Sequence, residues 1–441
     1  MKKRITACLL IVAFITTIAA GCSSGVEDTP TINQPTAIGS GAAAIMHVEA
    51  APLLRPSSPD SATQTVAAGA NDFAFRLSAL LAQDAGDDNL IVSPYSVWLP
   101  LAALLNATDE ANRGALLEAL GAGGVSVNDV NRAASRMLFD LTNSGRDWFE
   151  NQLHIANAIF VDNDVKLRRD FAQTFADYFR GTVMNVNFSS QEAVDAVNQW
   201  AYDNTEGLIT DIIQEFDPDT IAAIANAIYF SDGWFTEFNP NNTEQDVFHS
   251  PTGESTAYFM RRESFMSYFE DDTLQAVHLN FNSGGGMYIL LPRDVSATQL
   301  LKNMTAEYFE HIHNNTEARE GKLLLPRFSL ESKLDNLPDI LTALGVPLFC
   351  EASAPLTGGL IYDNLRVWVE DAVQKAMIEV DEKGTTAAAV TVMAAPGAGA
   401  PMLPELPPFV MKCDRPFVFV LYQTTFDGGA QVLFTGMVNK P

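Results

Sequence analysis

The sequence predicts an α+β fold, and three observations support this prediction. Residues 71–83 and 110–120 carry apolar side chains at the spacing of amphipathic helices. Residues 367–380 and 409–422 have the β-branched and aromatic composition of strands. Between these strands, residues 384–404 contain no charged side chain. A charge-poor loop of this length inside a compact domain is unusual unless the loop has a function.

The loop, about residues 382–408, has two halves with different chemistry. Residues 385–395 contain no Pro or Gly and are small or β-branched, apart from Met393. Such a segment could become a strand whose alternate side chains pass beneath their neighbours. Residues 396–408 contain five prolines and two glycines, which cannot join the middle of a sheet. The second half is therefore expected to stay exposed, although composition alone also fits an Ala-rich linker.

The elements before the loop follow from local periodicity. The helix over 71–83 is expected to bury one apolar face, and the helix over 110–120 is expected to stop at Gly121. Residues 157–160 have the composition of a strand. An aromatic side chain recurs every four residues farther on, which predicts a helix that packs into the core rather than a cofactor pocket. This aromatic stripe consists of Phe171, Phe175 and Phe179.

Segments on both sides of the loop resemble the serpin family. Residues 380–389, Val-Asp-Glu-Lys-Gly-Thr-Thr-Ala-Ala-Ala, are similar to the hinge of the serpin reactive loop. Residues 414–419, Asp-Arg-Pro-Phe-Val-Phe, and 433–441 are similar to the family's C-terminal signature. Further similar segments are 89–96, 204–209, 226–234 and 325–331. The resemblance implies one serpin domain over 69–441, with three β-sheets, about eight to nine helices and an exposed reactive-centre loop.

The resemblance also implies a function. A serpin inhibits a serine endopeptidase as a suicide substrate: the loop is cleaved, and its hinge half then inserts as a strand into the central sheet. Such a protein is not an enzyme, needs no cofactor and is expected to be a monomer. The alternative is a non-inhibitory serpin that acts as a binding, chaperone-like or surface scaffold protein. The small side chains over 385–391 favour inhibition, because non-inhibitory members tend to carry bulky, charged or Pro residues there.

The family's functional positions transfer to this sequence one by one. Gln374 stands where the family usually has a shutter histidine; an amide also donates and accepts hydrogen bonds, so we expect a working shutter with a different pH dependence. The hinge residues are Glu382, Gly384, Thr385, Thr386, Ala387, Ala388 and Ala389. The shutter and breach residues, at the middle and at the loop end of the central sheet, are Ser93, Ser96, Asn226, Trp234 and Gln374.

The family's spacing from Glu382 places the reactive bond at Ala398–Gly399. A small residue before the cut suits an elastase- or subtilisin-like serine protease, and a cysteine protease is also a candidate. The stretch from this bond to Asp414 is longer than the family's usual one. Cleavage at Met402 or Leu403 is therefore the alternative, and it would favour a chymotrypsin-like target.

The first residues have the pattern of a targeting segment. Three cations at 2–4 precede an apolar run over 9–20, which is too short to be a comfortable membrane span. The run ends in Gly21-Cys22-Ser23, which resembles a bacterial lipoprotein box. We therefore expect a prokaryotic lipoprotein with signal peptide 1–21, a lipid on Cys22 and a flexible Pro-, Ser- and Ala-containing tether over 22–68. The protein would be held at the cell envelope or extracellular face, or secreted if the segment is an ordinary signal peptide.

Composition argues against other kinds of partner. The formal charge is −27, from 54 acidic and 27 basic residues, which disfavours nucleic acid and polyanionic cofactors. Heparin binding is also not expected, because Arg132, Arg136 and Arg146 lie among acidic residues. The six histidines lack the spacing of metal ligands, so no metal site is predicted. Cys350 and Cys413 could form a disulfide, but two buried free thiols are favoured.

Overall fold

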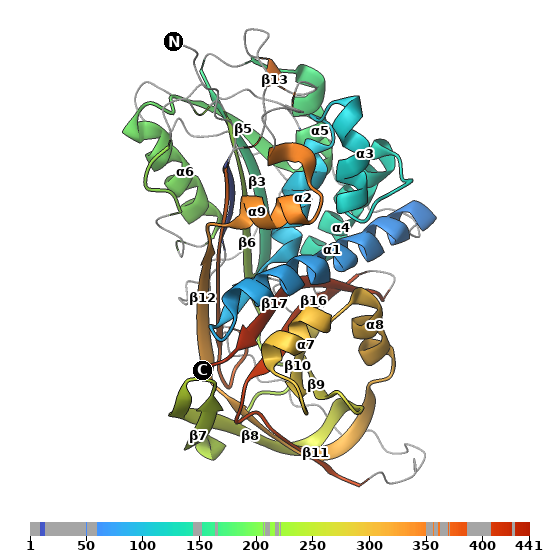
Figure 1. The fold of residues 1–441 in the computed structure, drawn as a ribbon, viewed down its shortest axis with the longest axis vertical. Helices are drawn as coiled ribbons and strands as arrows, with labels where there is room; N and C mark the ends of the chain where they lie inside the picture. The colour runs from blue at the N-terminus through green and yellow to red at the C-terminus, as the bar shows by residue number, and fades with distance from the viewer. Residues whose placement is uncertain are drawn as a thin grey trace, which may run out of the picture.

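The computed structural model confirms the predicted fold class. It describes residues 9–13, 50, 60–143, 152–163, 166–205, 207, 212–216, 220, 222–349, 356, 360–361, 369, 371–385, 407–425 and 428–441. Over these residues the chain forms nine α-helices and three β-sheets (Figure 1). The α-helices are α1 (Ser61–Ala85), α2 (Pro94–Leu104), α3 (Glu110–Ala119), α4 (Val127–Asn143), α5 (Arg169–Phe179), α6 (Gln191–Asn204), α7 (Ala297–Asn303), α8 (Ala306–Asn314) and α9 (Leu337–Ala343).

The central sheet has six strands and lies along the long axis of the molecule (Figure 1). Its strands, in spatial order, are β12 (Phe328–Leu334), β14 (Asp371–Val380), β1 (Leu9–Ala13), β6 (Ala222–Ser231), β3 (Gln152–Asp162) and β5 (Gly181–Val186). All ten residues of β6 are buried, as expected for a strand covered on both faces. The Ala-, Ile- and aromatic-rich sequence of β6 gives it that apolar character.

Strand β1 separates the two strands that flank the predicted insertion site. It pairs in parallel with β14 on one side and with β6 on the other. Val12 is the register partner of both Gln374 and Asn226, so these two residues lie at the same level, one strand apart. Since β14 and β6 are both parallel to β1, they run in the same direction. Strand β1 belongs to the segment 1–21 that the sequence analysis expects to be removed, and that expectation stays a prediction.

The second sheet has nine strands and curves around the other end of the molecule (Figure 1). Its main path is β15 (Phe409–Lys412), β11 (Glu317–Pro326), β8 (Gly253–Glu270), β9 (Leu274–Asn280), β10 (Gly286–Pro292), β16 (Phe417–Thr424), β17 (Ala430–Val438) and β2 (Leu90–Val92). Strand β7 (Glu244–Ser250) pairs with β8 off this path. A third, two-stranded sheet joins β13 (Leu360–Ile361) to β4 (Lys166–Leu167).

The main core lies between the second sheet and the helices that cover it. Helix α1 packs against α2, α4 and α7, and it also contacts β17. The buried face of α1 includes Phe73 and Leu77, as its periodicity predicts. Phe171, Phe175 and Phe179 are buried on α5, and their rings stack in sequence with centroids 6.2 and 6.4 Å apart. The aromatic stripe is therefore part of the core.

Helix α1 begins earlier than the sequence analysis expects. Its first residue is Ser61, and the Asp60 side chain accepts a hydrogen bond of 2.8 Å from the Thr63 backbone N–H. Such a cap stabilises the first turn of a helix. Residues 61–68, assigned above to the tether, are thus helical and form part of the domain. The prolines just before Asp60 obscured this start in the sequence.

Three further observations concern the described residues only. None of their helices is both long and apolar enough to cross a membrane. They contain no group of three or more His, Cys, Asp or Glu side chains arranged to hold a metal ion. Cys413 is a buried free thiol whose pKa is raised by its burial, whereas Cys350 lies outside these residues.

Candidate functional site

The described structure contains both ends of the predicted reactive loop. The chain is described up to Thr385 and resumes at Pro407. Glu382, Gly384 and Thr385 are therefore described. The other predicted loop residues, Thr386, Ala387, Ala388, Ala389, Ala398, Gly399, Met402 and Leu403, lie outside the described residues, as does Cys22.

The hinge begins with a tight turn directly after β14. The Asp381 backbone N–H donates to the Gly384 carbonyl at 3.1 Å, and the Asp381 side chain accepts from the Lys383 N–H at 2.8 Å. Gly384 has a φ of +153°, and a Cβ at this position would lie 2.2 Å from the Asp232 carbonyl oxygen. The turn therefore requires glycine, because any side chain would collide with the backbone beside it.

The segment after β6 holds this turn through its backbone. Trp234 N–H donates to the Lys383 carbonyl at 2.8 Å, and Phe238 N–H donates to the Glu382 carbonyl at 2.8 Å. Thr385 N–H in turn donates to the Asp232 carbonyl at 3.0 Å. The first residues of the loop are thus attached to the segment that follows β6.

Trp234, the predicted breach residue, is buried against the turn that follows β14. Its indole N–H donates to the Asp381 carbonyl at 2.9 Å, and only 2% of the residue is exposed. Its ring stacks on Phe281, with centroids 5.0 Å apart and an interplanar angle of 6°. The buried indole therefore links the hinge turn to the β9–β10 connection.

Glu382 is a buried carboxylate with an arginine partner. Its side chain is only 5% exposed and accepts hydrogen bonds from Arg327 Nε at 2.9 and 3.0 Å and from Arg327 NH2 at 2.7 Å. The Thr243 hydroxyl donates to the same carboxylate. Burial by itself raises the pKa of Glu382, but these hydrogen bonds outweigh it, so the pKa lies below its usual value. The carboxylate is therefore charged at neutral pH and fixes the hinge to the end of β11.

Asp232 is a second buried carboxylate at the breach. Its backbone carbonyl binds Thr385, while its side chain accepts hydrogen bonds from the backbone N–H and the hydroxyl of Ser283. Burial raises the pKa of Asp232 to about 6, and the hydrogen bonds from Ser283 only partly oppose this effect. A carboxyl group with a pKa of about 6 therefore lies directly behind Thr385.

Three of the predicted shutter residues meet in one hydrogen-bond network. Gln374, on β14, accepts from the Ser93 backbone N–H at 3.0 Å and donates to the Ser93 carbonyl at 2.9 Å. The Ser93 hydroxyl donates to Ser96 Oγ at 3.0 Å and is also within 2.9 Å of the Leu433 carbonyl. The amide of Gln374 thus both donates and accepts. It connects β14 to the start of α2.

Asn226, the fourth predicted shutter residue, belongs to a separate network. Its Nδ2 donates to Asn157 Oδ1 at 2.7 Å, and Asn157 Nδ2 donates to the Phe179 carbonyl at 2.6 Å. Asn226 Oδ1 is buried and has no hydrogen-bond donor among the described residues. Strand β1 lies between Asn226 and Gln374, so the two side chains take part in separate networks.

Sequence reasoning did not identify several residues that complete the site. Asn157 could have been noticed, because it is a polar residue inside an apolar strand segment. Four further residues have no recognisable sequence pattern around them, since they join the site only through contacts with residues far along the chain. These residues are Asp232, Thr243, Ser283 and Arg327.

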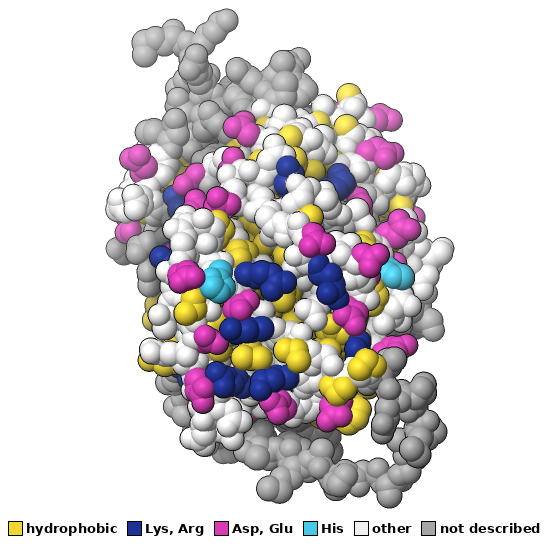
Figure 2. Space-filling view, turned by 60° about the horizontal axis from the view of Figure 1, so that its bottom comes forward, with side chains coloured by type: hydrophobic (Ala, Val, Ile, Leu, Met, Phe, Trp, Pro, Cys, Tyr) yellow, Lys and Arg dark blue, Asp and Glu magenta, His cyan; other side chains and the backbone are white. Residues whose placement is uncertain are grey.

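Charged side chains of both signs cover the end of the molecule to which the loop is attached. Figure 2, which brings the bottom of Figure 1 forward, shows Lys and Arg gathered on this face with Asp and Glu between them. Ion pairs between described residues of β7, β8 and β11 include Arg261–Glu244 at 2.9 Å and Lys322–Glu263 at 2.6 Å. Although the chain as a whole is strongly acidic, cations and carboxylates are interspersed on this face.

Comparison with known protein families and relatives agrees with this geometry. The family model described as "Serpin (serine protease inhibitor)" matches residues 68–441. Alpha-1-antitrypsin 1-3 of Mus musculus is 29% identical over 388 residues, which cover 86% of this chain and 90% of that protein. A serpin-like protein of Thermococcus kodakarensis is 28% identical over 441 residues, and the match covers 98% of this chain and 98% of that protein.

Solved structures show the same fold. The thermophilic serpin tengpin, in its native state, matches with a TM-score of 0.78 and 25% identity, over 91% of this chain and all of tengpin. Human thyroxine-binding globulin in complex with its hormone matches with a TM-score of 0.73 and 21% identity, over 86% of this chain and all of that protein. The second likeness concerns the fold alone.

Proposed function

We propose that this chain, which belongs to the serpin family, inhibits a serine protease by offering its loop as a substrate. The observation that carries the proposal is the position of the hinge. Thr385 leaves the end of β14 and is bound to the end of β6, the two strands between which the sheet accommodates one further strand. The residues that follow Thr385 are small enough to enter that place.

Strand directions support an insertion between β14 and β6. The turn at Asp381–Thr385 reverses the chain, so a strand that continues from it would run antiparallel to β14. Because β6 is parallel to β14, the same strand would be antiparallel to both neighbours, an arrangement that lets every backbone group pair. Strand β1 occupies part of this place in the parallel sense, and removal of the leader would vacate it.

The chemistry of trapping follows from ordinary acyl transfer. The serine hydroxyl of the protease attacks the Ala398 carbonyl, an ester forms, and the Ala398–Gly399 bond breaks with protonation of the Gly399 amine. The freed segment Thr385–Ala398 has 14 residues and would form a strand of roughly 46 Å. Its insertion would carry the esterified protease across the molecule. Distortion of the protease active site would then prevent water from completing the reaction.

The target is proposed from the residues near the bond. Ala398 suits an elastase- or subtilisin-like protease, and cleavage at Met402 or Leu403 would suit a chymotrypsin-like one. Cysteine proteases form a further class to test. Gly21-Cys22-Ser23 supports a lipid anchor that would hold the inhibitor at the cell envelope, as a monomer that acts on proteases outside the cell.

A panel of these proteases tests the inhibitory function. The expected result is a complex with one protease that survives SDS, with a fragment from the carboxyl side of the cut released on denaturation. Mass analysis of that fragment identifies the reactive bond. Cleavage of the loop by every protease without a stable complex would instead favour the non-inhibitory alternative.

Thermal unfolding of intact and cleaved protein provides an independent test of insertion. Cleavage between Pro396 and Leu403 should raise the unfolding temperature sharply, because the freed hinge half can then add a strand to the sheet. Equal unfolding temperatures before and after the cut would contradict insertion.

The lipid anchor has its own test. Cys22→Ala should move the protein from the membrane to the soluble fraction, and the wild-type N-terminal peptide should carry the mass of an acyl group. A variant that still partitions with membranes, together with an unmodified wild-type peptide, would contradict the anchor.

A further inference from the structure

The three residues that follow β6 are held by two different parts of the chain. The Thr385 N–H, in the hinge, donates to the Asp232 carbonyl at 3.0 Å. The Asn282 N–H, in the β9–β10 connection, donates to the Gly233 carbonyl at 3.0 Å. Residues 232–234, which we call the breach segment, therefore join the hinge to the β9–β10 connection.

Asp232 contacts both of these partners. Its backbone carbonyl accepts from the Thr385 N–H and also lies 3.3 Å from Thr385 Oγ1. Its side chain accepts from the Ser283 N–H at 3.1 Å and from the Ser283 hydroxyl. Only 8% of the residue is exposed. A single buried residue thus holds the first residue of the loop on one side and the β9–β10 connection on the other.

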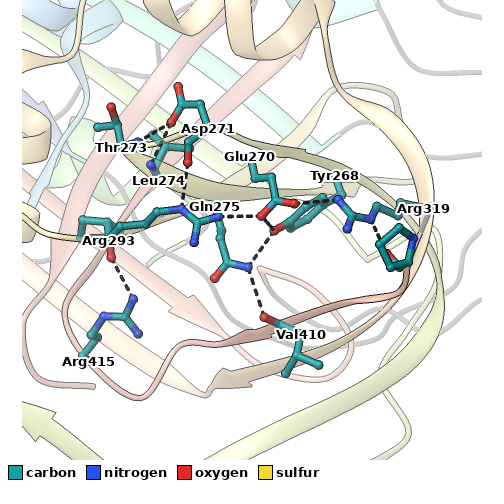
Figure 3. Close-up of polar contacts among 12 residues, drawn as sticks. Tyr268, Glu270, Asp271, Thr273, Leu274, Gln275, Arg293, Arg319, Val410 and Arg415 are labelled. Atoms are coloured by element: carbon teal, nitrogen blue, oxygen red, sulfur yellow. Dashed lines mark hydrogen bonds and ion pairs between the residues drawn. The ribbon is translucent and has the colours of Figure 1, made fainter.

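Asp232 has no cationic partner among the described residues. Other carboxylates at the two ends of the loop do have one. Glu382 pairs with Arg327 at 2.7 Å, and Glu270 pairs with Arg319 at 2.8 Å (Figure 3). Ionisation of Asp232 therefore places an uncompensated charge inside the breach, and such a charge is destabilised by its lack of water.

The other ionisable side chains of the hinge turn have separate partners or are exposed. The Asp381 side chain accepts from the Lys383 N–H at 2.8 Å, and Glu382 is bound by Arg327. Lys383 itself is exposed. None of these groups forms an ion pair with Asp232.

The other two segments beside Asp232 add no buried charge. Residues 281–285, in the β9–β10 connection, include no ionisable side chain. Residues 233–238 include only Glu237, which is exposed. A change in the charge of Asp232 is therefore not offset by another group in these segments.

Insertion of the loop would separate the hinge from the breach segment. Thr385 would have to leave the Asp232 carbonyl before the residues after it enter between β14 and β6. The gap formed in this step would admit water to the breach. Water stabilises an ionised carboxylate far more than a neutral carboxyl, so the energy of the step depends on whether Asp232 carries a proton.

We infer that Asp232 is a positioning residue that controls the release of Thr385 through its own protonation. With a proton on the carboxyl, the breach segment stays closed on the hinge. Without the proton, the buried charge favours opening, and loop insertion becomes faster. The inference rests on the proposed function, since it concerns the same loop. It describes an inhibitor that traps its target better at neutral than at acidic pH.

Hydrogen exchange tests this inference without a protease. Full-length protein is placed in D2O at pH 5, 6, 7 and 8, and mass analysis follows uptake in the fragments that contain Thr385 and Trp234, whose N–H groups donate across the breach. Each rate is divided by that of the unfolded peptide at the same pH. The pKa of about 6 in the closed breach and the ordinary value of 3.8 give about tenfold more frequent opening of wild type at pH 7 than at pH 5.

Three variants assign this pH step to Asp232. Asp232→Asn still accepts from Ser283 but does not titrate, so it should open equally at every pH and at least about tenfold less often than wild type at pH 7. Ser283→Ala removes a hydroxyl that lowers the pKa of Asp232, so its step should move to higher pH. Glu237→Gln removes an exposed carboxylate from the same stretch of chain and should follow wild type.

A wild-type profile without a step between pH 5 and pH 7 would overturn the inference. The same step in Asp232→Asn as in wild type would also overturn it. If Asp232→Asn folds poorly, the Ser283→Ala profile decides: a step at higher pH supports the inference, and an unmoved step contradicts it.

Titration against a protease separates this inference from the proposed function. At pH 8, Asp232→Asn should consume more inhibitor molecules per trapped protease than wild type, and comparison at one pH cancels the pH dependence of the protease. If wild type traps no protease but its exchange has the expected step, the inhibitory function fails and the control of the hinge by Asp232 stands. If wild type traps a protease but its exchange profile is flat, the inference fails and the inhibitory function stands.

Discussion

At the proximal end of the reactive loop, three backbone hydrogen bonds tie Lys383, Glu382 and Thr385 to residues 232–238. At the distal end, side-chain donors from Arg319 and Gln275 hold the backbone of Pro407 and Val410. Backbone contacts survive most substitutions, whereas each side-chain contact can be removed by a single change. The proposed loop insertion would also require the proximal contacts to break, while the distal ones could persist in the cleaved protein.

Both loop ends are nevertheless tied to arginines that belong to, or directly follow, the same strand. Arg319 lies in β11 and binds Pro407, and Arg327 follows β11 and binds Glu382. Eight residues separate them, which corresponds to roughly 26 Å along a strand. This strand therefore sets the span of the loop. The two ends are therefore expected to respond differently to substitution.

The largest effect is expected at the proximal end, for Thr385→Arg. Thr385 is fully buried, and insertion would take it into the sheet. Burying an unpaired charge costs several kcal/mol, and each 1.4 kcal/mol on the insertion barrier slows insertion tenfold. Deacylation should then win, so the variant becomes a substrate that is cleaved without a covalent complex. Gel analysis and titration of protease activity measure the outcome.

Ala387→Ser is the control for that variant, because serine is small and can form hydrogen bonds inside a sheet. It should remain largely inhibitory. A Thr385→Arg protein that trapped protease with wild-type stoichiometry would remove strand insertion from the mechanism.

Gly384→Ala should weaken the proximal end in the intact protein only. The added Cβ would lie 2.2 Å from the Asp232 carbonyl and 2.7 Å from Gly233 Cα, and both atoms belong to the backbone. Relief of this overlap is expected to cost about 2–3 kcal/mol. The unfolding temperature of intact protein should fall, and that of cleaved protein should change less, because its hinge has left this place. An equal loss in both forms would contradict the proposed movement.

Asp232→Asn should change how stability depends on pH. The folded-state pKa of about 6 lies above the ordinary value of 3.8. The contribution of this carboxyl to folding stability is therefore fully present below pH 3.8, and it is lost as the pH rises through 6. Asparagine does not titrate and can still accept from Ser283. As the pH rises from 4 to 7, the unfolding free energy of the variant should therefore increase by on the order of 2 kcal/mol relative to that of wild type. Unfolding free energies at pH 4, 5, 6 and 7 measure this gain, and parallel curves for the two proteins would refute it.

The smallest effect is expected at the distal strand, for Lys412→Met. Lys412 pairs with Asp246 at 3.1 Å and Asp414 at 3.2 Å, but its side chain is 37% exposed. Exposed ion pairs of this kind contribute about 1 kcal/mol or less. The unfolding free energy should therefore fall by no more than that, in intact and cleaved protein alike. A larger loss would mean that the ion pairs of Lys412 contribute more to the stability of β15 than exposed pairs usually do.

Much of the fold could be predicted because its signals are local. The stripe of three phenylalanines places one face of α5 in the core by helical periodicity. The segment over 380–389 was identified as a hinge through its resemblance to the hinge of the serpin reactive loop. The start of α1 was predicted too late, because one capping Asp at position 60 is a weak signal after a Pro-containing stretch.

The candidate site could be predicted only in part. Gln374 and Asn226 were named as shutter residues without their partners, and the structure joins Gln374 to Ser93 and Asn226 to Asn157. These partners are separated by up to 281 residues in the chain. Side-chain amides pair with whatever the packed strands bring near them, so their choice of partner depends on register and strand order.

By itself, the sequence determined the order of helices and strands, the buried faces and the composition of the loop, because each depends on residues that are close together in the chain. The environment of Asp232 and the hydrogen bond from Arg319 to the Pro407 carbonyl depend on the packing of distant segments. Asp232 titrates near neutral pH because distant segments bury it, and Arg319 reaches the loop because β11 and β15 pair in parallel. Burial and pairing between remote segments are properties of the packed chain, and no local pattern encodes them.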